Sequence, residues 1–232
     1  MNALKVTVIL PTINEEQGVG KTIDSINRDY FKKKNWELEI MIVDGDSKDK
    51  TQEIAKSKGA KVVVEKRKGY GRAYKTGMPK ATGDILVTGD ADATYPFERI
   101  HKYVQQLIDE DLDFITTDRF AELKHGSMSV KHYFGNSILA YTLKILYFAN
   151  IRDSQSGMWI FKKSALEKIK PLEEFDDGMP FSEEIKIEMF KSKKVKAKEI
   201  PSALYARVGD IKLESFSDGW RNLKFLIFNR VK

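Results

Sequence analysis

Short apolar runs alternate along the first half of the chain with longer stretches in which apolar residues recur at helical spacing. Short apolar runs bounded by turn residues are typical of buried strands, and the longer period is typical of helices packed on one face. Such alternation indicates an α/β fold, with a mostly parallel sheet covered by helices on both faces. The pattern predicts strands at 5–10, 37–43, 61–65, 84–88 and 113–116 and helices at 15–29, 49–58, 70–81 and 96–110.

Beyond residue 117 the alternation breaks down. Residues 118–132 contain several cations and a glycine, and we expect a mobile loop over the site. The last helix, at about 214–230, has apolar residues at helical spacing, so it either packs on the domain or lies at a membrane surface. The other predicted elements are a helix at 133–149, a strand ending near Phe161, a helix opening at 178–184 with Ser182 as its cap, and strands at 195–200 and 203–207.

The 232 residues contain no linker-like segment and no internal repeat, so one domain is expected. Within residues 1–232 we assign a nucleotide-sugar-binding half (1–117), an acceptor-binding half (118–213) and a C-terminal amphipathic helix (214–232). The N-terminus leads directly into a strand-like run, which makes cytoplasmic residence the default expectation.

Composition excludes several kinds of site. Cysteine is absent and the chain has three histidines, so disulfides and thiolate metal sites are excluded and a zinc site is not expected. The net charge of +6 either reflects a solvated surface or attracts an anionic nucleotide, phospholipid or lipid phosphate. No nucleic-acid-binding module is recognisable, so nucleic acid is not an expected partner.

The most informative motif is Asp90-Ala91-Asp92, which directly follows the strand at 84–88. Because side chains alternate along an extended chain, Asp90 and Asp92 can share one side and converge on one cation. Mg²⁺ and Mn²⁺ prefer oxygen ligands and are commonly completed by substrate phosphates. The motif therefore predicts a site for a metal ion and a diphosphate.

Polar residues also follow the first two strands, and the carboxyl ends of parallel strands line the ligand crevice of such a sheet. Asp44 ends an apolar strand and precedes a glycine, so we expect it to contact ligand. Asn14 could also act locally, as the cap of the helix that follows it. Asp46 or Ser47 could likewise cap the helix at 49–58. The two segments are Pro11-Thr12-Ile13-Asn14-Glu15-Glu16 and Asp44-Gly45-Asp46-Ser47.

A glycine-rich segment, Gly69-Tyr70-Gly71-Arg72-Ala73, follows three cations and precedes a predicted helix. Backbone N–H groups at the start of a helix can hold a phosphate group. A glycine pair of this kind is also common in ordinary turns. Gly71 and Arg72 are therefore candidate donor-binding residues if the segment lies in the same crevice.

Taken together, six ordered motifs resemble the family 2 inverting glycosyltransferases, and within them the dolichyl-phosphate or polyprenyl-phosphate sugar synthases. The resemblance covers nearly the whole chain and implies the nucleotide-diphospho-sugar transferase (GT-A) fold, with a Rossmann-like sheet. The motifs are Leu10 to Glu16, Val43 to Ser47 with Thr51, Gly69 to Ala73, Asp90-Ala91-Asp92 with Tyr95-Pro96, Asp153 to Gly157, and Arg207 to Leu213.

The resemblance implies a role for each matching position in the donor half. Asp90 and Asp92 would bind the metal ion and the diphosphate, and Asp44 would hold the base. The other implied donor-binding residues are Pro11, Asn14, Glu15, Asp46, Gly71, Arg72 and Ala91.

In the acceptor half, Arg119 and Lys131 match positions where the family places cations for the acceptor phosphate. Lys131 stands where an arginine is expected and lacks its bidentate fork. Arg207 and Lys212 are further candidates for this phosphate. The catalytic residues implied are Asp92, Asp153 and Arg119, although the segment after Asp153 ends in Met158-Trp159 and lacks the arginine of the family motif.

The expected function is metal-dependent, inverting transfer of a hexose from a GDP- or UDP-sugar to dolichyl or polyprenyl phosphate. Its expected location is peripheral, at the cytoplasmic face of the cell membrane. A phosphate monoester is largely a dianion at neutral pH, so such an acceptor requires no general base.

Three alternatives remain open. The same donor chemistry could serve a sugar hydroxyl or another soluble acceptor, with Asp153 or Glu183 as the base. The chain could instead be a non-catalytic nucleotide-sugar-binding or membrane-binding protein. A nucleotidyltransferase is more distant, because the glycine-rich N-terminal loop of that class is absent. Many relatives continue beyond the position of Arg230 into membrane-spanning helices, so the chain is either a short peripheral form or part of a longer protein.

Overall fold

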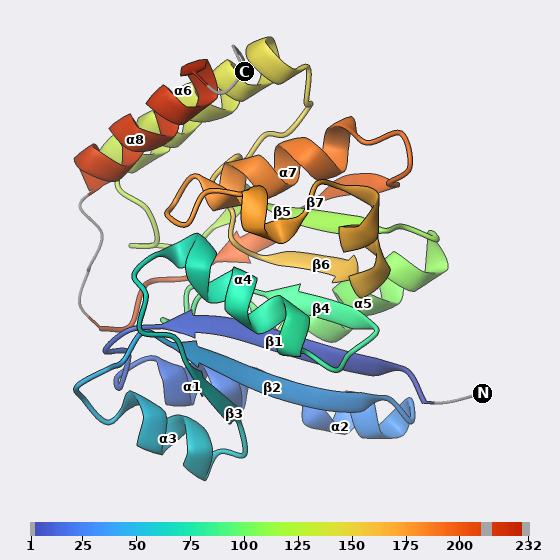
Figure 1. Ribbon diagram of the computed structural model, residues 1–232. Coiled ribbons are helices and arrows are strands. Elements are labelled where there is room, and N and C mark those ends of the chain that lie inside the picture. Colours follow the sequence, from blue (N-terminus) through green and yellow to red (C-terminus); the bar gives the residue numbers. More distant parts are fainter. Residues whose placement is uncertain (1–2, 210–214, 229–232) are drawn as a thin grey trace.

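The computed structural model describes residues 3–209 and 215–228 (Figure 1). Seven strands form one sheet in the order β3-β2-β1-β4-β6-β5-β7. Strands β1 to β4 are parallel, β5 is parallel to β7, and β6 is antiparallel to both of its neighbours. The predicted mostly parallel α/β sheet is confirmed. The strands are β1 (Lys5–Thr12), β2 (Glu37–Asp44), β3 (Lys61–Val64), β4 (Ile85–Thr88), β5 (Phe114–Leu123), β6 (Trp159–Lys162) and β7 (Ala197–Leu204).

Helices cover both faces of the sheet, and two of them form a further layer at one end (Figure 1). Short 3₁₀ turns occupy Phe97–Arg99, Lys163–Lys168 and Leu172–Glu174. The α-helices are α1 (Val19–Ser25), α2 (Arg28–Lys33), α3 (Thr51–Ser57), α4 (Tyr70–Lys80), α5 (Ile100–Asp109), α6 (Val130–Tyr147), α7 (Phe181–Lys191) and α8 (Ser215–Phe228).

The alternation of side chains along the strands produces two cores, one on each face of the sheet. In β1, Val8 points into the core formed with α1, α2, α3 and α5, and Ile9 points into the core formed with α4 and α7. In β2, Ile42 likewise points into the first of these cores and Met41 into the second. These strands are apolar on both sides because both of their faces are covered.

Helices α6 and α8 lie side by side and share a third, smaller core (Figure 1). Leu143 of α6 and Leu226 of α8 are fully buried there, and the Tyr147 hydroxyl donates to the Leu226 carbonyl at 2.9 Å. Ile187 of α7 belongs to the same cluster. The predicted last helix thus packs on the protein, while its expected ends at Glu214 and Arg230 lie outside the described residues. Within the described part of the chain, no helix combines the length and apolar character needed to cross a bilayer.

Three predicted boundaries differ from the structure. The helix expected at 15–29 is two helices, because Ile26 is extended and the Asn27 side chain caps α2 by accepting from the Tyr30 amide at 3.1 Å. The loop expected at 118–132 is shorter, since β5 extends to Leu123 and α6 begins at Val130. The strands expected at 195–200 and 203–207 are the single strand β7. Its Pro201 is tolerated at the sheet edge, where the register with β5 shifts.

Candidate active site

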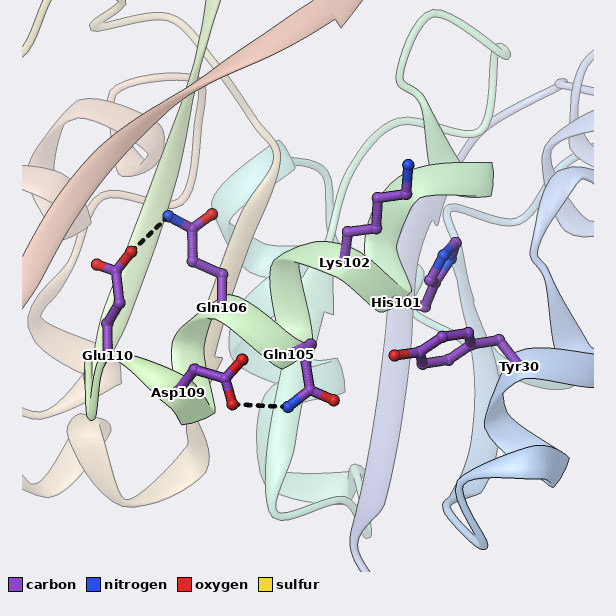
Figure 2. Close-up of a pocket in the computed structure, with 7 residues that line it drawn as sticks. All are labelled: Tyr30, His101, Lys102, Gln105, Gln106, Asp109 and Glu110. Atoms are coloured by element: carbon purple, nitrogen blue, oxygen red, sulfur yellow. Dashed lines mark hydrogen bonds between the residues drawn. The ribbon is translucent and has the colours of Figure 1, made fainter.

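The candidate site lies at the carboxyl ends of β1, β2 and β4. A separate groove of about 440 Å³ runs along α5, where the rings of Tyr30 and His101 lie 4.3 Å apart (Figure 2). Burial lowers the pKa of His101, which keeps its ring neutral at pH 7. None of the residues singled out from the sequence lines that groove.

Arg207 connects two of the predicted loops. Its Nη1 group lies 2.7 Å from Asp92 Oδ2, and its Nη2 group lies 2.7 Å from Glu15 Oε1. Glu15 follows β1 and Asp92 follows β4, so parallel neighbouring strands bring these carboxylates to one place. The expected convergence of the first and fourth strand ends is present, with an arginine from beyond β7 between them.

Asp92 is held in position by its own turn. Its Oδ1 atom accepts from the Thr94 amide at 3.1 Å and from the Thr94 hydroxyl at 2.7 Å. The start of α1 packs tightly against this turn, since a Cβ at Gly18 would lie 2.7 Å from the Ala91 carbonyl oxygen and 2.8 Å from Asp92 Cα. Glycine is therefore required at position 18 for the turn to approach α1 this closely.

Asp90 is poised for a cation. Burial and the negative charge of Asp92 raise the pKa of Asp90 to about 7. Within the described residues, no group of three or more carboxylate, imidazole or thiolate side chains forms a complete metal cage. Two neighbouring carboxylates nevertheless fit a Mg²⁺ or Mn²⁺ ion that takes its remaining ligands from phosphate oxygens and water. The residues thus fit the predicted metal ion.

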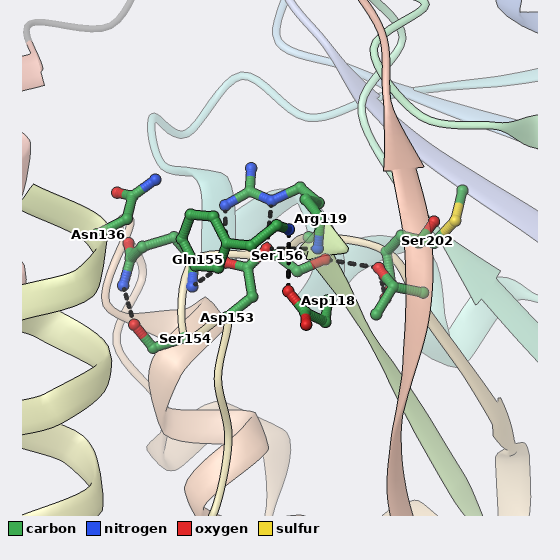
Figure 3. Close-up of polar contacts among 12 residues, drawn as sticks. Asp118, Arg119, Asn136, Asp153, Ser154, Gln155, Ser156 and Ser202 are labelled. Atoms are coloured by element: carbon green, nitrogen blue, oxygen red, sulfur yellow. Dashed lines mark hydrogen bonds and ion pairs between the residues drawn. The ribbon is translucent and has the colours of Figure 1, made fainter. Parts of the chain in front are cut away.

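Arg119 and Asp153 form a buried bidentate pair (Figure 3). Arg119 Nε lies 2.6 Å from Asp153 Oδ2, and its Nη2 lies 2.9 Å from Oδ1. Burial alone would raise the pKa of Asp153, but the guanidinium charge outweighs this effect and holds the pKa below its usual range. The pair fixes the orientation of Arg119 and leaves its Nη1 group outside these two bonds.

The loop from Asp153 to Gly157 is held by hydrogen bonds with residues of other segments. The Gly157 amide donates to the Tyr95 hydroxyl at 2.7 Å, and Thr88 Oγ1 donates to the Gly157 carbonyl at 2.8 Å. Buried Lys186 of α7 donates to the carbonyls of Ser154 and Ser156. This loop therefore presents Asp153 to Arg119 from a rigid support.

The residues after β2 are engaged with one another. The fully buried Asp44 carboxylate accepts from Thr12 Oγ1 at 2.9 Å, from the amide and hydroxyl of Ser47, and from Gln52 Nε2 at 2.7 Å. These bonds tie the ends of β1 and β2 together. Asp46 lies nearer the surface and pairs with Lys48 at 2.6 Å.

The predicted cap roles are wrong. Asn14 adopts a left-handed conformation (φ 51°), and its Oδ1 atom accepts from the Lys48 amide at 2.8 Å instead of capping a helix. Neither Asp46 nor Ser47 caps α3, since residue 50 occupies the cap position and makes no side-chain cap bond. Ser182 lies inside α7 and donates to the Ser156 carbonyl at 3.4 Å. Asn14 and Ser182 thus bond to other segments, whereas Asp46 pairs with Lys48, two residues along the chain.

The glycine-rich segment packs against the chain itself. The Gly71 amide donates to the Gly178 carbonyl at 3.2 Å, and the Arg72 amide donates to the Asp177 carbonyl at 2.9 Å. The Arg72 side chain pairs with Glu173 at 3.0 Å and with Asp177. These two amides are occupied, so the helix-start mode of phosphate binding has no open donor at either residue.

Of the remaining candidate site residues, the structure describes Pro11, Ala91 and Lys131. Pro11 pairs with Val43 in the sheet, and Ala91 is buried in the turn between the two aspartates. Lys131 is exposed in the first turn of α6, and no described contact ties it to Arg119. Lys212 lies outside the described residues.

Sequence reasoning missed several residues that shape the site. Thr94 could have been found, because a threonine two residues after an aspartate is the spacing of a local side-chain turn. Lys186 carried only a weak signal, a lysine between two isoleucines in a predicted helix. Gln155 donates to Glu183 and accepts from Asn222 Nδ2 at 2.7 Å, which links the loop to α7 and α8. No local pattern reveals that pairing.

Residues 7–170 match the sequence model of the family described as "Glycosyl transferase family 2". The chain belongs to this family. The glycosyltransferase is 35% identical over 228 residues to the low-salt glycan biosynthesis hexosyltransferase Agl6 of Haloferax volcanii, covering 96% of this chain and 53% of that protein. The chain thus spans about half the length of that relative. It is 30% identical over 212 residues to a dolichyl-phosphate hexose transferase of the same organism, covering 91% and 88% of the two chains.

Solved structures confirm the GT-A fold of the glycosyltransferase. Mannosyl-3-phosphoglycerate synthase from Rubrobacter xylanophilus superposes with a TM-score of 0.76 at 20% identity, covering 99% of this chain and 74% of that one. Glucosyl-3-phosphoglycerate synthase from Mycobacterium tuberculosis, solved with Mn²⁺ and UDP, gives 0.73 at 18% identity, covering 98% and 80%. The resemblance to family 2 enzymes drawn from the motifs is confirmed.

Proposed function

We propose that this glycosyltransferase moves a hexose from a GDP- or UDP-sugar to dolichyl or polyprenyl phosphate, with inversion at the anomeric carbon. The observation that carries the proposal is the placement of two arginines, Arg119 and Arg207, around the Asp90–Asp92 turn. Guanidinium groups suit phosphate oxygens on both an incoming acceptor and a departing diphosphate. A relative named as a dolichyl-phosphate hexose transferase that matches over most of both chains also supports this acceptor class.

The proposed step is a direct displacement. An oxygen of the acceptor phosphate forms a bond to C1 of the sugar, while the bond from C1 to the β-phosphate oxygen breaks. The electron pair of the broken bond leaves with the nucleoside diphosphate. No proton is transferred, because the acceptor phosphate enters as a dianion. Arg119 would aim this phosphate, and its pair with Asp153 would fix that aim.

Asp90 and Asp92 would hold a Mg²⁺ or Mn²⁺ ion together with the diphosphate. When bound, the ion would offset the negative charge that develops on the leaving group. Arg207 forms an ion pair with Asp92 in the structure, so we infer that its guanidinium moves to phosphate oxygens when the donor enters. Glu15 would keep Arg207 at the edge of the crevice during this exchange.

The two acids considered as bases for a hydroxyl acceptor are poorly suited to that role. Asp153 is fully buried and bonded to Arg119 through both carboxylate oxygens. Glu183 is also fully buried, and burial raises its pKa to about 8, so it is mostly protonated at pH 7. A base must be ionised and within reach of the proton that it takes. A lipid-phosphate acceptor needs neither residue.

We further infer that residues 1–117 bind the donor and residues 118–213 bind the acceptor, at the cytoplasmic membrane face. Support for a peripheral membrane position comes from the exposed apolar side chains of α6 and α8. The same helices carry exposed cations, and the apolar set includes large residues that normally avoid water. The set consists of Val130, Phe134, Ile138, Tyr141, Ile145, Trp220, Ile227 and Phe228.

The test is an extraction assay. The purified protein is incubated with Mg²⁺ or Mn²⁺, radiolabelled GDP- or UDP-hexoses and dolichyl phosphate in detergent, and then extracted with organic solvent. We expect label in the lipid phase, lost on chelation and reduced by about 10²-fold or more in Asp92→Asn. Asp109→Asn, an exposed residue at the end of α5, is the matched control and should retain full activity. Donor hydrolysis without lipid label, in a detergent that supports a known lipid-phosphate transferase, would refute the proposed acceptor.

A further inference from the structure

Gln155 connects the loop that carries Asp153 to helix α8. Its Oε1 atom accepts from Asn222 Nδ2 of α8 at 2.7 Å. Its Nε2 group donates to Glu183 of α7 and to the Ser154 hydroxyl at 3.0 Å. Both polar atoms of this side-chain amide are therefore engaged, and the partner of its oxygen belongs to α8.

The backbone of Gln155 contacts the buried ion pair directly (Figure 3). The Gln155 amide donates at 3.1 Å to Asp153 Oδ1, the same oxygen that accepts from Arg119 Nη2 at 2.9 Å. The backbone amide of Asp153 donates to Glu199 of β7 at 2.9 Å, which holds the main chain of this residue in place. The direction of the Asp153 carboxylate then depends on Gln155 and Arg119. Three hydrogen bonds thus lead from α8 to the Arg119 guanidinium.

Asn222 is an unusual residue for its position. It is 3% exposed and lies one helical turn before Leu226, which is fully buried in the core shared by α6 and α8. Burial of a polar side chain costs free energy unless its polar atoms are hydrogen-bonded, and Asn222 Oδ1 has no partner among the described residues. An aliphatic residue would pack there without this cost. The bond from Asn222 to Gln155 is what an aliphatic residue could not supply.

We propose that Asn222 is a positioning residue of the acceptor site, which acts through Gln155 and Asp153 to set the direction of Arg119. The inference rests on the proposed role of Arg119 toward the acceptor phosphate. It extends the acceptor site to α8, whose Asn222 lies 67 positions beyond Gln155 in the sequence. Asp92 is held by its own turn, so the donor side should not depend on this bond.

The first experiment measures transfer to dolichyl phosphate in detergent by the variant Asn222→Leu. Leucine keeps the branched shape of asparagine but cannot donate, so Gln155 Oε1 loses its partner and the loop is held less firmly. We expect the KM for dolichyl phosphate to rise about fivefold, while the KM for the nucleotide-sugar stays within about twofold of the wild-type value. Lys224→Met is the matched control, since it also removes a polar group from α8 but changes an exposed side chain. Both of its KM values should equal those of the wild type.

A double-variant cycle shows whether Asn222 acts through Gln155. Gln155→Met keeps the length of the side chain and removes its amide, so the bond from Asn222 is already lost in this background. We expect Asn222→Leu to change the KM for dolichyl phosphate by less than about twofold there. An effect of about fivefold that persists in the Gln155→Met background would reveal another route and overturn the inference.

The KM for the nucleotide-sugar separates positioning from general damage to the fold. A similar rise in both KM values, or a wild-type KM for dolichyl phosphate in Asn222→Leu, would also overturn the inference while the proposed function stands. If Asn222→Leu does not fold, Asn222→Ala replaces it, because the smaller side chain cannot clash. Absence of transfer by the wild-type protein would instead refute the proposed function, and with it the acceptor role of Arg119.

Discussion

At the scale of single residues, two arginines neutralise three of the carboxylates of the site. Asp92 and Glu15 share Arg207, and Asp153 is matched by Arg119. Asp90 has a different environment, because its negative neighbour and its burial both favour the protonated form. This imbalance of charge at Asp90 is what a divalent cation would correct.

Metal affinity should therefore depend on pH through Asp90. The pKa of Asp90 is raised to about 7, so below this pH a proton competes with the ion for the carboxylate. We expect the Kd for Mn²⁺ to rise by up to about tenfold for each pH unit below 7 and to level off above pH 8. Calorimetric titration at pH 6, 7 and 8 measures this, with Asp90→Asn as the control. Affinity that does not vary over this range would contradict the assignment.

Glu183 gives a second pH dependence, this time in stability. Its pKa in the folded protein is raised by burial to about 8 from an ordinary value of 4.5, so the folded state binds the proton more tightly than the unfolded state. Its contribution to stability is complete below pH 4.5 and is lost as the pH rises to 8. Glu183→Gln should thus gain stability over the wild type as the pH rises from 5 to 8, by a few kcal/mol in total.

Urea unfolding of both proteins at pH 5, 6.5 and 8 measures this difference. The same variant tests the base role, since Gln can still accept from Gln155. We expect its transfer activity to stay within about threefold of the wild type, whereas loss of a general base costs about 10²-fold or more. A stability difference that is constant with pH would contradict the buried, protonated state of Glu183.

At the scale of elements, the sequence predicted what depends on local pattern and missed what depends on distant partners. Short apolar runs identified β1 to β4 and therefore the strand ends that carry Glu15, Asp44 and Asp92. Asn14 was misassigned as a helix cap, because its actual partner, the Lys48 amide, lies on another loop. Likewise, the contact between Arg207 and Asp92 joins positions 115 residues apart, and no spacing rule predicts it.

The packing of the Asp153 loop on α4 yields a prediction at this scale. A Cβ at Gly157 would lie 2.5 Å from the Tyr70 hydroxyl and 3.8 Å from Asp90 Oδ1. Gly157→Ala should displace the loop and lower kcat by about tenfold or more, because catalytic geometry tolerates little misplacement. Removing the obstructing hydroxyl in the double variant Gly157→Ala/Tyr70→Phe should recover much of that loss. Steady-state kinetics of the two single variants and the double variant measure the coupling, and additive losses would contradict the proposed clash.

At the scale of the whole molecule, the fold separates two surfaces. The parallel strands β1 to β4 bring together the carboxylates proposed to bind the donor, and β5, the Asp153 loop and α6 would supply the proposed acceptor side. The described residues of α6 carry cations but no acidic side chain, and one stripe of its apolar residues, which includes Phe134 and Ile138, is exposed. A helix with these properties favours the surface of an anionic membrane.

Membrane binding should therefore depend on the outer stripe of α6. Phe134 and Ile138 are 64% and 58% exposed, so changing both to Ser removes apolar surface without opening a core. In co-sedimentation with phosphatidylcholine vesicles containing phosphatidylglycerol, we expect the double variant to bind about tenfold more weakly or worse. Val64→Ser/Ile108→Ser, two exposed apolar residues on β3 and α5, is the matched control and should bind like the wild type. Added salt should weaken wild-type binding, because part of the attraction comes from Lys131 and Lys144. Equal binding by the two double variants would show that α6 does not face the bilayer, and the lipid acceptor would then have to reach Arg119 by another route.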